Sequence, residues 1–269
     1  MGGEPVVVRE LNVSLAGLPN GLEGLRIAHV SDLHFRRWDR VTHAAQRLLL
    51  TLDYDLLAVT GDLGRFRRNW RKAADLTRRF FEPLAQRSTA YAVLGNHDDQ
   101  HLTEADLPLR FLGNKSVSFD FFGTELKLAG VDQSTRKAEN LSAALGNGIT
   151  RVPTVLLAHY PSTIFRLQIG SVQLVLSGHT HGGQIRIPGL GCLWTNDRIP
   201  LRMSRGLHQV DGTTIHVSPG IGVSLPLRFR WNCPPEVTVL SLVTSADSRD
   251  APDSGPMDHK TDLVCESFV

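Results

Sequence analysis

The stretch LRIAHVSDLH, residues 25–34, places a strand pattern directly before a carboxylate and an imidazole. Its first six residues form a short, mostly apolar run, which is typical of a buried β-strand. The polar tip that follows contains Asp32 and His34 two positions apart, and on extended backbone side chains at this spacing point to the same side. The stretch therefore predicts a buried strand that ends in a chelating pair.

The same arrangement recurs along the chain. Further short apolar runs occupy residues 56–60, 91–94, 155–158 and 172–176. Polar tips accompany them, with the sequences GD at 61–62, GNHDD at 95–99, AHYP at 158–161 and SGHTHGG at 177–183. Because loops at the carboxyl ends of strands in α/β sheets converge on one crevice, we expect these side chains to form one site.

Helix patterns separate the first three of these runs. Residues 41–52 and 69–86 carry apolar residues at mixed spacings of three and four, as amphipathic helices do. Alternating residues between 116 and 131, and again between 213 and 244, favour antiparallel strands, and residues 6–15 form an extended segment. Strands separated by helices occur in the first part of the chain, and hairpins follow in the later part. This order predicts an α/β (α+β) fold whose core is two mixed β-sheets.

The composition indicates one globular domain. The chain has 269 residues, of which 41% are hydrophobic, so it has enough apolar material for one large core. We assign residues 1–244 to a single catalytic domain and expect the polar, turn-rich residues 245–269 to be a disordered tail. The net charge of +2 is too small to imply a nucleic-acid partner by itself.

Cysteine usage and the N-terminus favour a reducing compartment. The three cysteines, Cys192, Cys233 and Cys265, form no CxxC pair and are odd in number, which argues against a disulfide framework. The N-terminus shows no signal-peptide pattern, and no run approaches the roughly 18 apolar residues of a membrane span. We therefore expect a cytoplasmic protein that meets a membrane, if at all, peripherally at the inner face.

The polar tips have the chemistry of a metal site. They offer carboxylate oxygen, amide oxygen and imidazole nitrogen without thiolate, which suits divalent Mn, Fe, Zn, Ni or Co. A carboxylate such as Asp62 can bridge two ions through its two oxygens. Two such ions lower the pKa of a shared water and neutralise charge on a transferring phosphoryl group. The residues are therefore compatible with two divalent cations and with phosphoryl chemistry.

Five blocks, D-x-H, GD, GNHD, H and GHTH, occur in an order that resembles the calcineurin-like metallophosphoesterases, over residues 25–220. The resemblance implies a four-layer αββα sandwich, with two mixed sheets flanked by helices, and phosphodiester or pyrophosphate hydrolysis. More narrowly, SDLH with SGHTHGGQIRIPG and LPLRFRWNCPPE resemble the bacterial YaeI/YkuE/LpxG-type phosphodiesterase branch.

The resemblance also implies a role for each site residue. One ion would be held by Asp32, His34 and His181, and the other by Asn96, His159 and His179. Asp62 would bridge the ions, and a hydroxide shared by them would attack phosphorus in line. His97 would not bind metal but would act as general acid for the leaving oxygen, with Asp98 orienting its imidazole.

Two basic and aromatic stretches bear on the substrate. Residues 65–79 carry seven basic residues against one acid, together with Phe66 and Trp70, and form either a lid over an anionic substrate or an ordinary solvated helix face. Residues 225–231, LPLRFRW, alternate apolar and basic residues in a manner suited to a membrane surface or an acyl chain. With the branch resemblance, these stretches favour a lipid-linked substrate such as UDP-2,3-diacylglucosamine.

Other interpretations remain open at this stage. The same metal core could serve a nuclease or a nucleotide phosphodiesterase, although the near-neutral net charge makes nucleic acid an unlikely partner. A scaffold that has lost its metals is a third alternative. The remaining histidines are expected to be packed or surface residues, with His101 as a candidate for the substrate cleft; they are His29, His43, His101, His208, His216 and His259.

Overall fold

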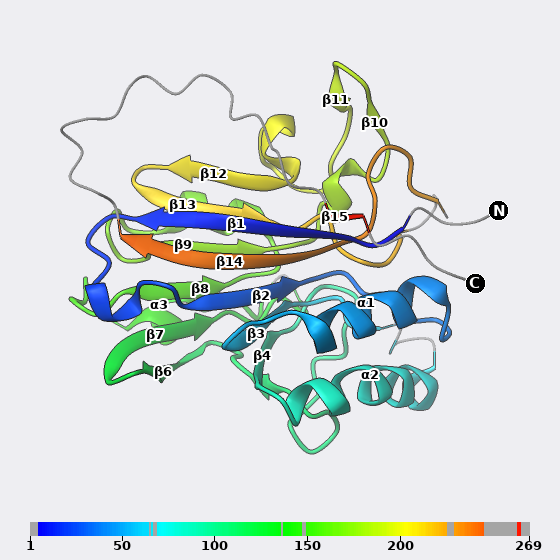
Figure 1. Ribbon diagram of the computed structural model, residues 1–269, viewed down its shortest axis with the longest axis horizontal. Coiled ribbons are helices and arrows are strands. Elements are labelled where there is room, and N and C mark those ends of the chain that lie inside the picture. Colours follow the sequence, from blue (N-terminus) through cyan, green and yellow to red (C-terminus); the bar gives the residue numbers. More distant parts are fainter. Residues whose placement is uncertain are drawn as a thin grey trace.

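The first three apolar runs form parallel neighbours in one sheet. They are β2 (Arg26–Val30), β3 (Leu56–Thr60) and β4 (Thr89–Val93), and each is buried almost throughout. Burial on both faces explains why these strands are continuously apolar and not alternating. The computed structural model (Figure 1) describes residues 5–64, 66, 69–135, 137–146, 149–224, 229–244 and 263–264.

This sheet is completed by strands from both ends of the described chain. Its order is β15-β1-β14-β2-β3-β4-β5. The additional strands are β1 (Val7–Leu15), β5 (Arg110–Phe111), β14 (Glu236–Thr244) and β15 (Leu263–Val264). β1 runs parallel to β14 along its whole length, and β14 runs antiparallel to β2. Sheet one is therefore mixed, as predicted. Apart from β15, the predicted tail 245–269 lies outside the described residues.

The second sheet has the order β12-β13-β9-β8-β7-β6. Its strands are β6 (Lys115–Phe121), β7 (Thr124–Gly130), β8 (Thr154–Leu157), β9 (Leu174–Ser177), β12 (Gly206–Val210) and β13 (Thr213–Val217). Hairpins β6–β7 and β12–β13 are antiparallel, whereas β7, β8, β9 and β13 run parallel. A separate small hairpin joins β10 (Arg186–Ile187) to β11 (Gly191–Cys192).

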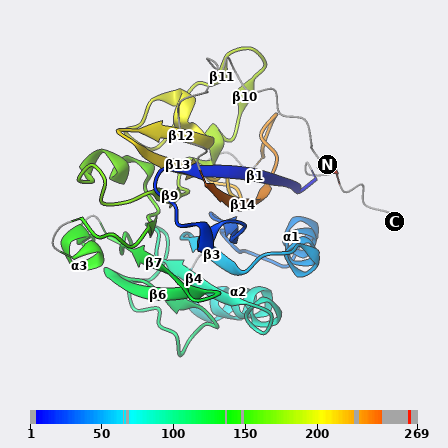
Figure 2. The same ribbon diagram turned by 60° about the vertical axis from the view of Figure 1, so that its left-hand side comes forward.

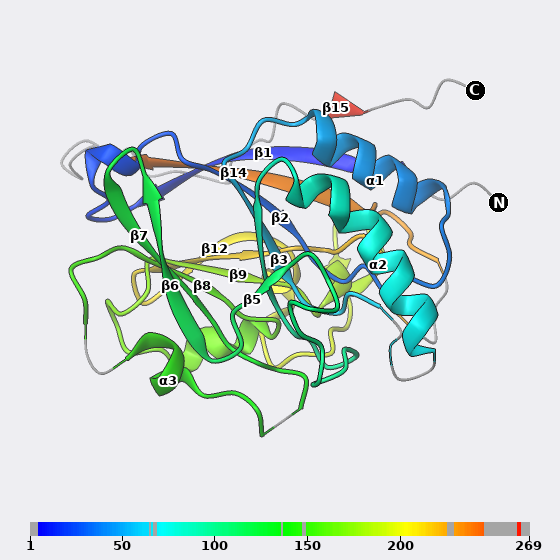
Figure 3. The same cartoon turned by 90° about the horizontal axis from the view of Figure 1, so that it is seen from below.

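Helices α1 (Arg40–Thr51) and α2 (Trp70–Ala85) cover the outer face of the first sheet (Figures 2 and 3). The side chains of Asp39 and Asn69 cap their first turns by accepting a main-chain N–H. Both helices lie within one residue of the predicted ranges. No helix among the described residues combines the length and the apolar character needed to cross a bilayer.

The outer face of the second sheet has a thinner cover. It consists of α3 (Leu141–Leu145) and the 3-10 turns η2 (Pro161–Arg166) and η4 (Leu201–Ser204), while two further turns are η1 (Asn20–Leu22) and η3 (His181–Gly183). The predicted α/β fold with two mixed sheets is confirmed. The fourth layer consists of short turns here, because these segments carry too few consecutive helix-forming residues to build long helices.

The two sheets pack face to face, with side chains alternating between layers. On β2, Ile27 enters the core between the sheets, whereas Ala28 and Val30 face the helices. On β9, Leu174 and Leu176 enter the same central core, while Val175 packs toward the outer turns. This alternation is the period-two rule of strands, and it buries both faces of each sheet.

The alternating residues between 213 and 244 form two strands that each have an antiparallel neighbour, β12 for β13 and β2 for β14, but the two strands lie in different sheets. β13 lies in the second sheet beside β9 and β12, whereas β14 lies in the first sheet between β1 and β2. Alternation indicates that one face of a strand is buried, but it does not identify the partner strand. The chain changes sheets between these two strands.

A buried histidine pair joins the sheets. Nδ1 of His29 on β2 lies 2.8 Å from Nδ1 of His216 on β13, and Nε2 of His29 lies 2.9 Å from the Thr60 hydroxyl. Both rings are fully buried, and Nε2 of His216 has no hydrogen-bond partner in the described structure. Burial, followed by the charge of nearby His208, lowers the pKa of His216 to about 3. The pair is therefore neutral in the native state.

We expect this pair to make the metal-free protein sensitive to acid. Since the native pKa of His216 lies below the unfolded value, its contribution to stability is complete above pH ~6.5 and is lost as the pH falls toward 3. At pH 5 the loss from this one ring is about 2 kcal/mol. Urea unfolding at pH 7 and pH 5 measures it: His216→Gln should reduce the difference between the two pH values, while His43→Gln, at an exposed position, should not. An unchanged difference in His216→Gln would contradict the assignment.

Candidate metal centre

The polar tips of five strands meet where the two sheets come together. Asp32 and His34 follow β2, Asp62 follows β3, and Asn96 follows β4. From the second sheet, His159 follows β8, and His179 and His181 follow β9. Parallel strands present their carboxyl ends at the same edge, and here two sheets do so at a shared seam. The structure thus brings together the seven side chains for which the sequence predicted metal binding.

Asp32, His34 and His181 form one buried group whose ligand atoms converge. Nε2 of His34 lies 3.1 Å from Nε2 of His181, and Oδ1 of Asp32 lies 3.3 Å from the same His181 nitrogen. Oδ1 of Asp32 is buried and accepts no hydrogen bond in the described structure, while its Oδ2 accepts the main-chain N–H of His179. A cation would satisfy the orphaned oxygen and the two facing nitrogens together.

A second group surrounds His159. Its Nε2 lies 3.1 Å from Oδ1 of Asn96, 3.2 Å from Nδ1 of His179 and 3.4 Å from Oδ2 of Asp62. That same Asp62 oxygen also lies 3.4 Å from Nε2 of His34 in the first group. Asp62 therefore stands between the two groups, at equal distance from one imidazole of each. This is the position that a bridging ligand requires.

The ligand positions are marked by unusual backbone. Ten described non-glycine residues have positive φ, and five of them are Asp32, His34, Asp62, His179 and His181, with φ between 47° and 68°. Such conformations are uncommon for residues with a side chain, and they cluster at functional sites where the surrounding structure enforces them. The left-handed region is thus the local geometry that aims these side chains.

This finding corrects the expectation for the first pair. Asp32 and His34 do not lie on extended backbone, because both have positive φ. Their main-chain N–H groups instead donate to the carbonyls of Gly61 and Asp62, at 3.0 and 2.9 Å. The loops after β2 and β3 therefore remain hydrogen-bonded to each other beyond the sheet, which holds the two tips side by side.

Close approach of the loops depends on glycine at two positions. A Cβ at Gly178 would collide with the Ser31 hydroxyl and with Oδ2 of Asp32, and a Cβ at Gly95 would collide with Oδ1 of Asp62. Gly95 thus lets the GNHDD loop pack directly against the Asp62 carboxylate, and Gly178 lets the SGHTHGG loop pack directly against the Asp32 carboxylate.

Asp98 supports the centre in a manner that the sequence did not predict. Its carboxylate accepts main-chain N–H groups from Asp62 and Leu63, both at 2.8 Å, and from Gly95 at 2.9 Å. Burial and then the nearby Asp62 charge raise the pKa of Asp98 to about 7, against these donors. The hydrogen bonds of Asp98 described here all come from the main chain, and the expectation that it orients the His97 ring stays a prediction.

The electrostatics of the centre fit cation binding. Burial raises the pKa of Asp32 to about 6. Burial alone would also raise the pKa of Asp62, but the imidazoles of His159 and His34 hold it well below its usual range. His159 is fully buried, yet Asp62 raises its pKa to about 10. In the metal-free protein the proton on His159 thus supplies the positive charge beside Asp62, and metal binding there would release this proton.

Two further imidazoles, those of His179 and His181, are already in the ligand form. Burial and the neighbouring His159 lower the pKa of His179 to about 4, and burial with His34 holds the pKa of His181 well below its usual range. Neutral imidazole is the form that coordinates metal. Donors of oxygen and nitrogen without thiolate fit divalent first-row cations and leave the identity of the ions open.

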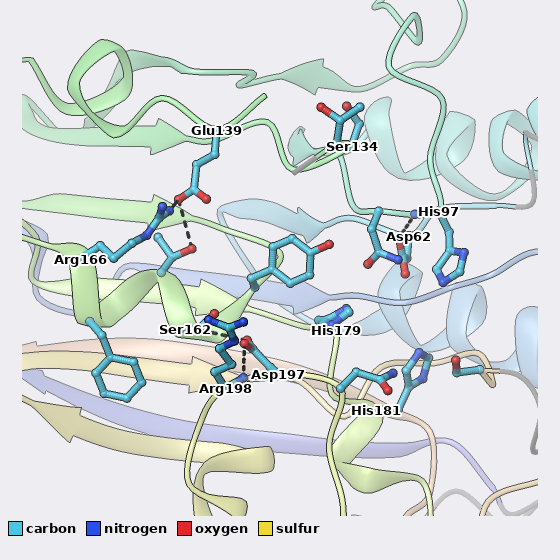
Figure 4. Close-up of a pocket in the computed structure, with 17 residues that line it drawn as sticks. Asp62, His97, Ser134, Glu139, Ser162, Arg166, His179, His181, Asp197 and Arg198 are labelled. Atoms are coloured by element: carbon cyan, nitrogen blue, oxygen red, sulfur yellow. Dashed lines mark hydrogen bonds and ion pairs between the residues drawn. The ribbon is translucent and has the colours of Figure 1, made fainter. Parts of the chain in front are cut away.

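A large cleft begins at these residues. Its volume is about 940 Å³, and Asp62, Asn96, His97, His179 and His181 line one end. Figure 4 shows Glu139 and Arg166 at the opposite end, paired with each other, with Asp197 and Arg198 on the wall between. Sequence analysis missed these wall residues, because they lie in loops. The position of Tyr160 directly after His159 was the one signal available for the lining.

The basic stretch 65–79 does not form a lid over this cleft in the part of the chain that the structure describes. Phe66 is buried in the helix-side core, and the Arg79 guanidinium lies 4.0 Å from the centroid of the Trp38 ring. None of the described residues of this stretch lines the cleft. The solvated helix face is thus the better interpretation. His101 is exposed and lies outside the cleft, at a surface depression with Asp99 and Gln100.

Comparison with known proteins identifies the family. Residues 25–183 match the model of the calcineurin-like phosphoesterases. The chain is 31% identical to an uncharacterised metallophosphoesterase of Aquifex aeolicus, over 87% of this chain and 91% of the relative. It is 27% identical to the uncharacterised metallophosphoesterase YkuE of Bacillus subtilis, over 84% of this chain and 81% of the relative.

A similar match is found with the phosphodiesterase YaeI of Escherichia coli, which is 27% identical over 85% of this chain and 86% of the relative. Members of the family use two divalent metal ions, and the structure contains two candidate groups for them, which are Asp32, His34 and His181, and Asp32, Asp62 and His159. The family model covers more than half of the 269 residues. The chain therefore belongs to the calcineurin-like phosphoesterase family and is a metal-dependent phosphoester hydrolase.

Proposed function

We propose that the protein is a dimetal phosphodiesterase that hydrolyses phosphodiester or pyrophosphate bonds. The observation that carries the proposal is the convergence of seven oxygen and nitrogen ligands at one end of a cleft of about 940 Å³. Asp32, His34 and His181 would hold one ion, Asn96, His159 and His179 the other, and Asp62 both. When bound, the ions supply an acidified water and positive charge for the phosphoryl group.

His97 is the proposed proton donor. Its main-chain N–H donates to Oδ1 of Asp62 at 2.8 Å, which fixes its position, while its side chain is exposed and lines the cleft. Its ring stands edge-on to that of His34, with centroids 5.2 Å apart. In this proposal the imidazole lies beside the ligands and does not bind metal itself. From there it can donate a proton to the oxygen that leaves phosphorus.

We favour a diester as the substrate, and the cleft has room for the organic groups that such a substrate carries. A bare phosphate group needs only the metal end, whereas the cleft continues past Tyr160 to Phe165 and Arg166. That wall gives room and polar partners for a substituent on phosphorus. Similarity to the phosphodiesterase YaeI supports the same choice. Within this class we favour a lipid-linked diester or pyrophosphate, of which UDP-2,3-diacylglucosamine is an example.

The first test is hydrolysis of bis(p-nitrophenyl) phosphate and of p-nitrophenyl phosphate by metal-stripped protein. We expect the stripped protein to be inactive, and Mn, Ni, Zn, Co or Mg, added singly, to restore hydrolysis of the diester more than of the monoester. A folded protein without diesterase activity under any of these metals would overturn the proposed function.

A second part of the same experiment tests the lipid-linked substrate. With the best metal, UDP-2,3-diacylglucosamine in detergent is compared with soluble nucleotide diesters and with single-stranded DNA. Good turnover of the soluble diesters with none of the lipid would remove the lipid assignment while leaving the phosphodiesterase intact. Cleavage of DNA would favour the nuclease alternative.

Asp62→Asn should lower the occupancy of both ions together. The amide keeps the oxygen that accepts the His97 N–H but loses the negative charge and one of the two ligand oxygens. Metal content per chain, measured by atomic emission after gel filtration, should fall from two toward zero. Asp99→Asn is the matched control, because Asp99 lies outside the ligand groups and its Oδ1 accepts the His101 N–H. Two fully occupied sites in Asp62→Asn would refute the bridging role.

His97→Ala should retain both ions and lose turnover by about 10²- to 10⁴-fold on a diester with an alkyl leaving group. The loss should be much smaller with a p-nitrophenolate leaving group, which departs without a proton. His101→Ala serves as control, since this histidine is exposed outside the cleft. Loss of metal in His97→Ala, or an equal loss of rate for both leaving groups, would exclude the role of general acid.

A further inference from the structure

One surface of the molecule concentrates exposed apolar side chains. Among the described residues twelve large hydrophobic side chains are exposed, and six of them lie between residues 190 and 231. The six are Leu190, Leu193, Trp194, Leu201, Phe229 and Trp231. Leu190 is 74% exposed, Leu193 60% and Trp194 68%. Exposed apolar residues are ordinary when scattered, but such a group marks an interaction site.

These six side chains come from segments that lie together. The β10–β11 hairpin, with Leu190 in its turn, projects from the body in Figure 1. Trp231 is hydrogen-bonded to the start of this hairpin, with its N–H on the Gln184 carbonyl and its carbonyl on the Arg186 N–H, both at 3.0 Å. The turn η4, which contains Leu201, contacts β11. We call the six residues the apolar ridge.

The ridge is anchored to the metal centre. The Arg186 guanidinium donates to the Gly182 carbonyl and to the Ser204 hydroxyl, both at 2.9 Å, and the Cys192 thiol donates to the Trp194 carbonyl at 2.8 Å. Gly182 follows the proposed ligand His181 directly. Arg186 thereby ties the hairpin to the loop after His181 and to η4, and the Cys192 bond fixes the segment that carries Leu193 and Trp194.

Positive charge accompanies the ridge. Residues 185–205 contain four arginines against the single acid Asp197. Arg198 and Arg202 are exposed, and the Asp197 carboxylate is engaged by the Ser162 N–H at 2.9 Å. Tryptophan, leucine and phenylalanine next to arginine are the combination that binds the interface of an anionic bilayer, where apolar groups enter the headgroup boundary and cations meet lipid phosphates.

The ridge is also continuous with the catalytic cleft. Asn196, Asp197 and Arg198 line the cleft and follow Trp194 within four residues. A bilayer that lies on the ridge would therefore meet the rim of the cleft. We propose that the apolar ridge docks the protein on the surface of an anionic phospholipid bilayer. This inference deepens the proposed function and rests on it, because docking would bring a lipid-linked substrate to the cleft. Docking itself is measurable without turnover.

The test is sedimentation of the full chain with vesicles. Equal parts of phosphatidylcholine and phosphatidylglycerol are compared with pure phosphatidylcholine, at low and high salt. We expect binding to the anionic vesicles that weakens with salt. The double substitution Leu193→Ser with Trp194→Ser should weaken that binding at least about tenfold, since it removes two inserted apolar side chains.

Phe122→Ser is the matched control. Phe122 is 90% exposed in the turn between β6 and β7, outside the ridge, so its loss should leave vesicle binding unchanged. Absence of binding by the unaltered protein, or equal binding by the double variant, would overturn the proposal. The proposal would also fall if light scattering showed that the unaltered protein is a dimer that does not bind vesicles and that the double variant is a monomer. The ridge would then be a protein interface.

Hydrolysis of bis(p-nitrophenyl) phosphate separates this proposal from the proposed function. The double variant should keep the full rate of the unaltered protein on this soluble diester, since neither side chain lines the cleft. If no protein hydrolyses the diester while vesicle binding behaves as expected, the proposed function fails and the docking surface stands. If hydrolysis is normal and vesicles are not bound, the docking surface fails alone.

Discussion

Two buried carboxylates, Asp32 and Asp62, and the imidazoles of His34, His159 and His181 occupy one small volume at the seam of the two sheets. Concentrating like groups away from water is unfavourable unless charge of the opposite sign compensates them. In the protein alone, protonated His159 compensates Asp62, and the raised pKa of Asp32 removes part of the remaining charge. Two divalent cations do so more fully, which explains why the rest of the fold is arranged to hold these groups in place.

Holding these carboxylates and imidazoles in place requires strained backbone, and contacts elsewhere in the fold offset the free energy of that strain. Five ligand residues have positive φ, at a cost of order 1–3 kcal/mol each for a residue with a side chain. The compensation lies in the sheets, where β2, β3 and β4 are buried on both faces, and in Asp98, whose carboxylate binds three main-chain N–H groups of the ligand loops. A rigid, apolar scaffold thus supports a polar and strained edge.

This division explains which features the sequence could predict. The buried strands and the helices α1 and α2 follow from apolar periodicity, which is a local pattern. The seven candidate ligands follow from the polar tips directly after the strands together with the resemblance of their order to the calcineurin-like phosphoesterases. The partner of β14, the pairing of His29 with His216 and the burial of Phe66 depend on contacts between distant segments, so local patterns did not reveal them. The three main-chain donors to Asp98 were not predicted for the same reason, because they come from two separate loops.

The same division separates chemistry from specificity. The candidate ligands lie within four residues of strand ends, so the strands fix their positions, and the metal chemistry is set by the core. Glu139, Arg166 and Asp197 line the far part of the cleft from loops and short turns, and the apolar ridge is a projecting hairpin with its neighbours. Changes in these segments leave both sheets intact, because loops bear few of the core contacts. Substrate choice can therefore vary while the metal centre stays the same, and the loops, more than the order of the ligand blocks, carry the information about what this hydrolase acts on.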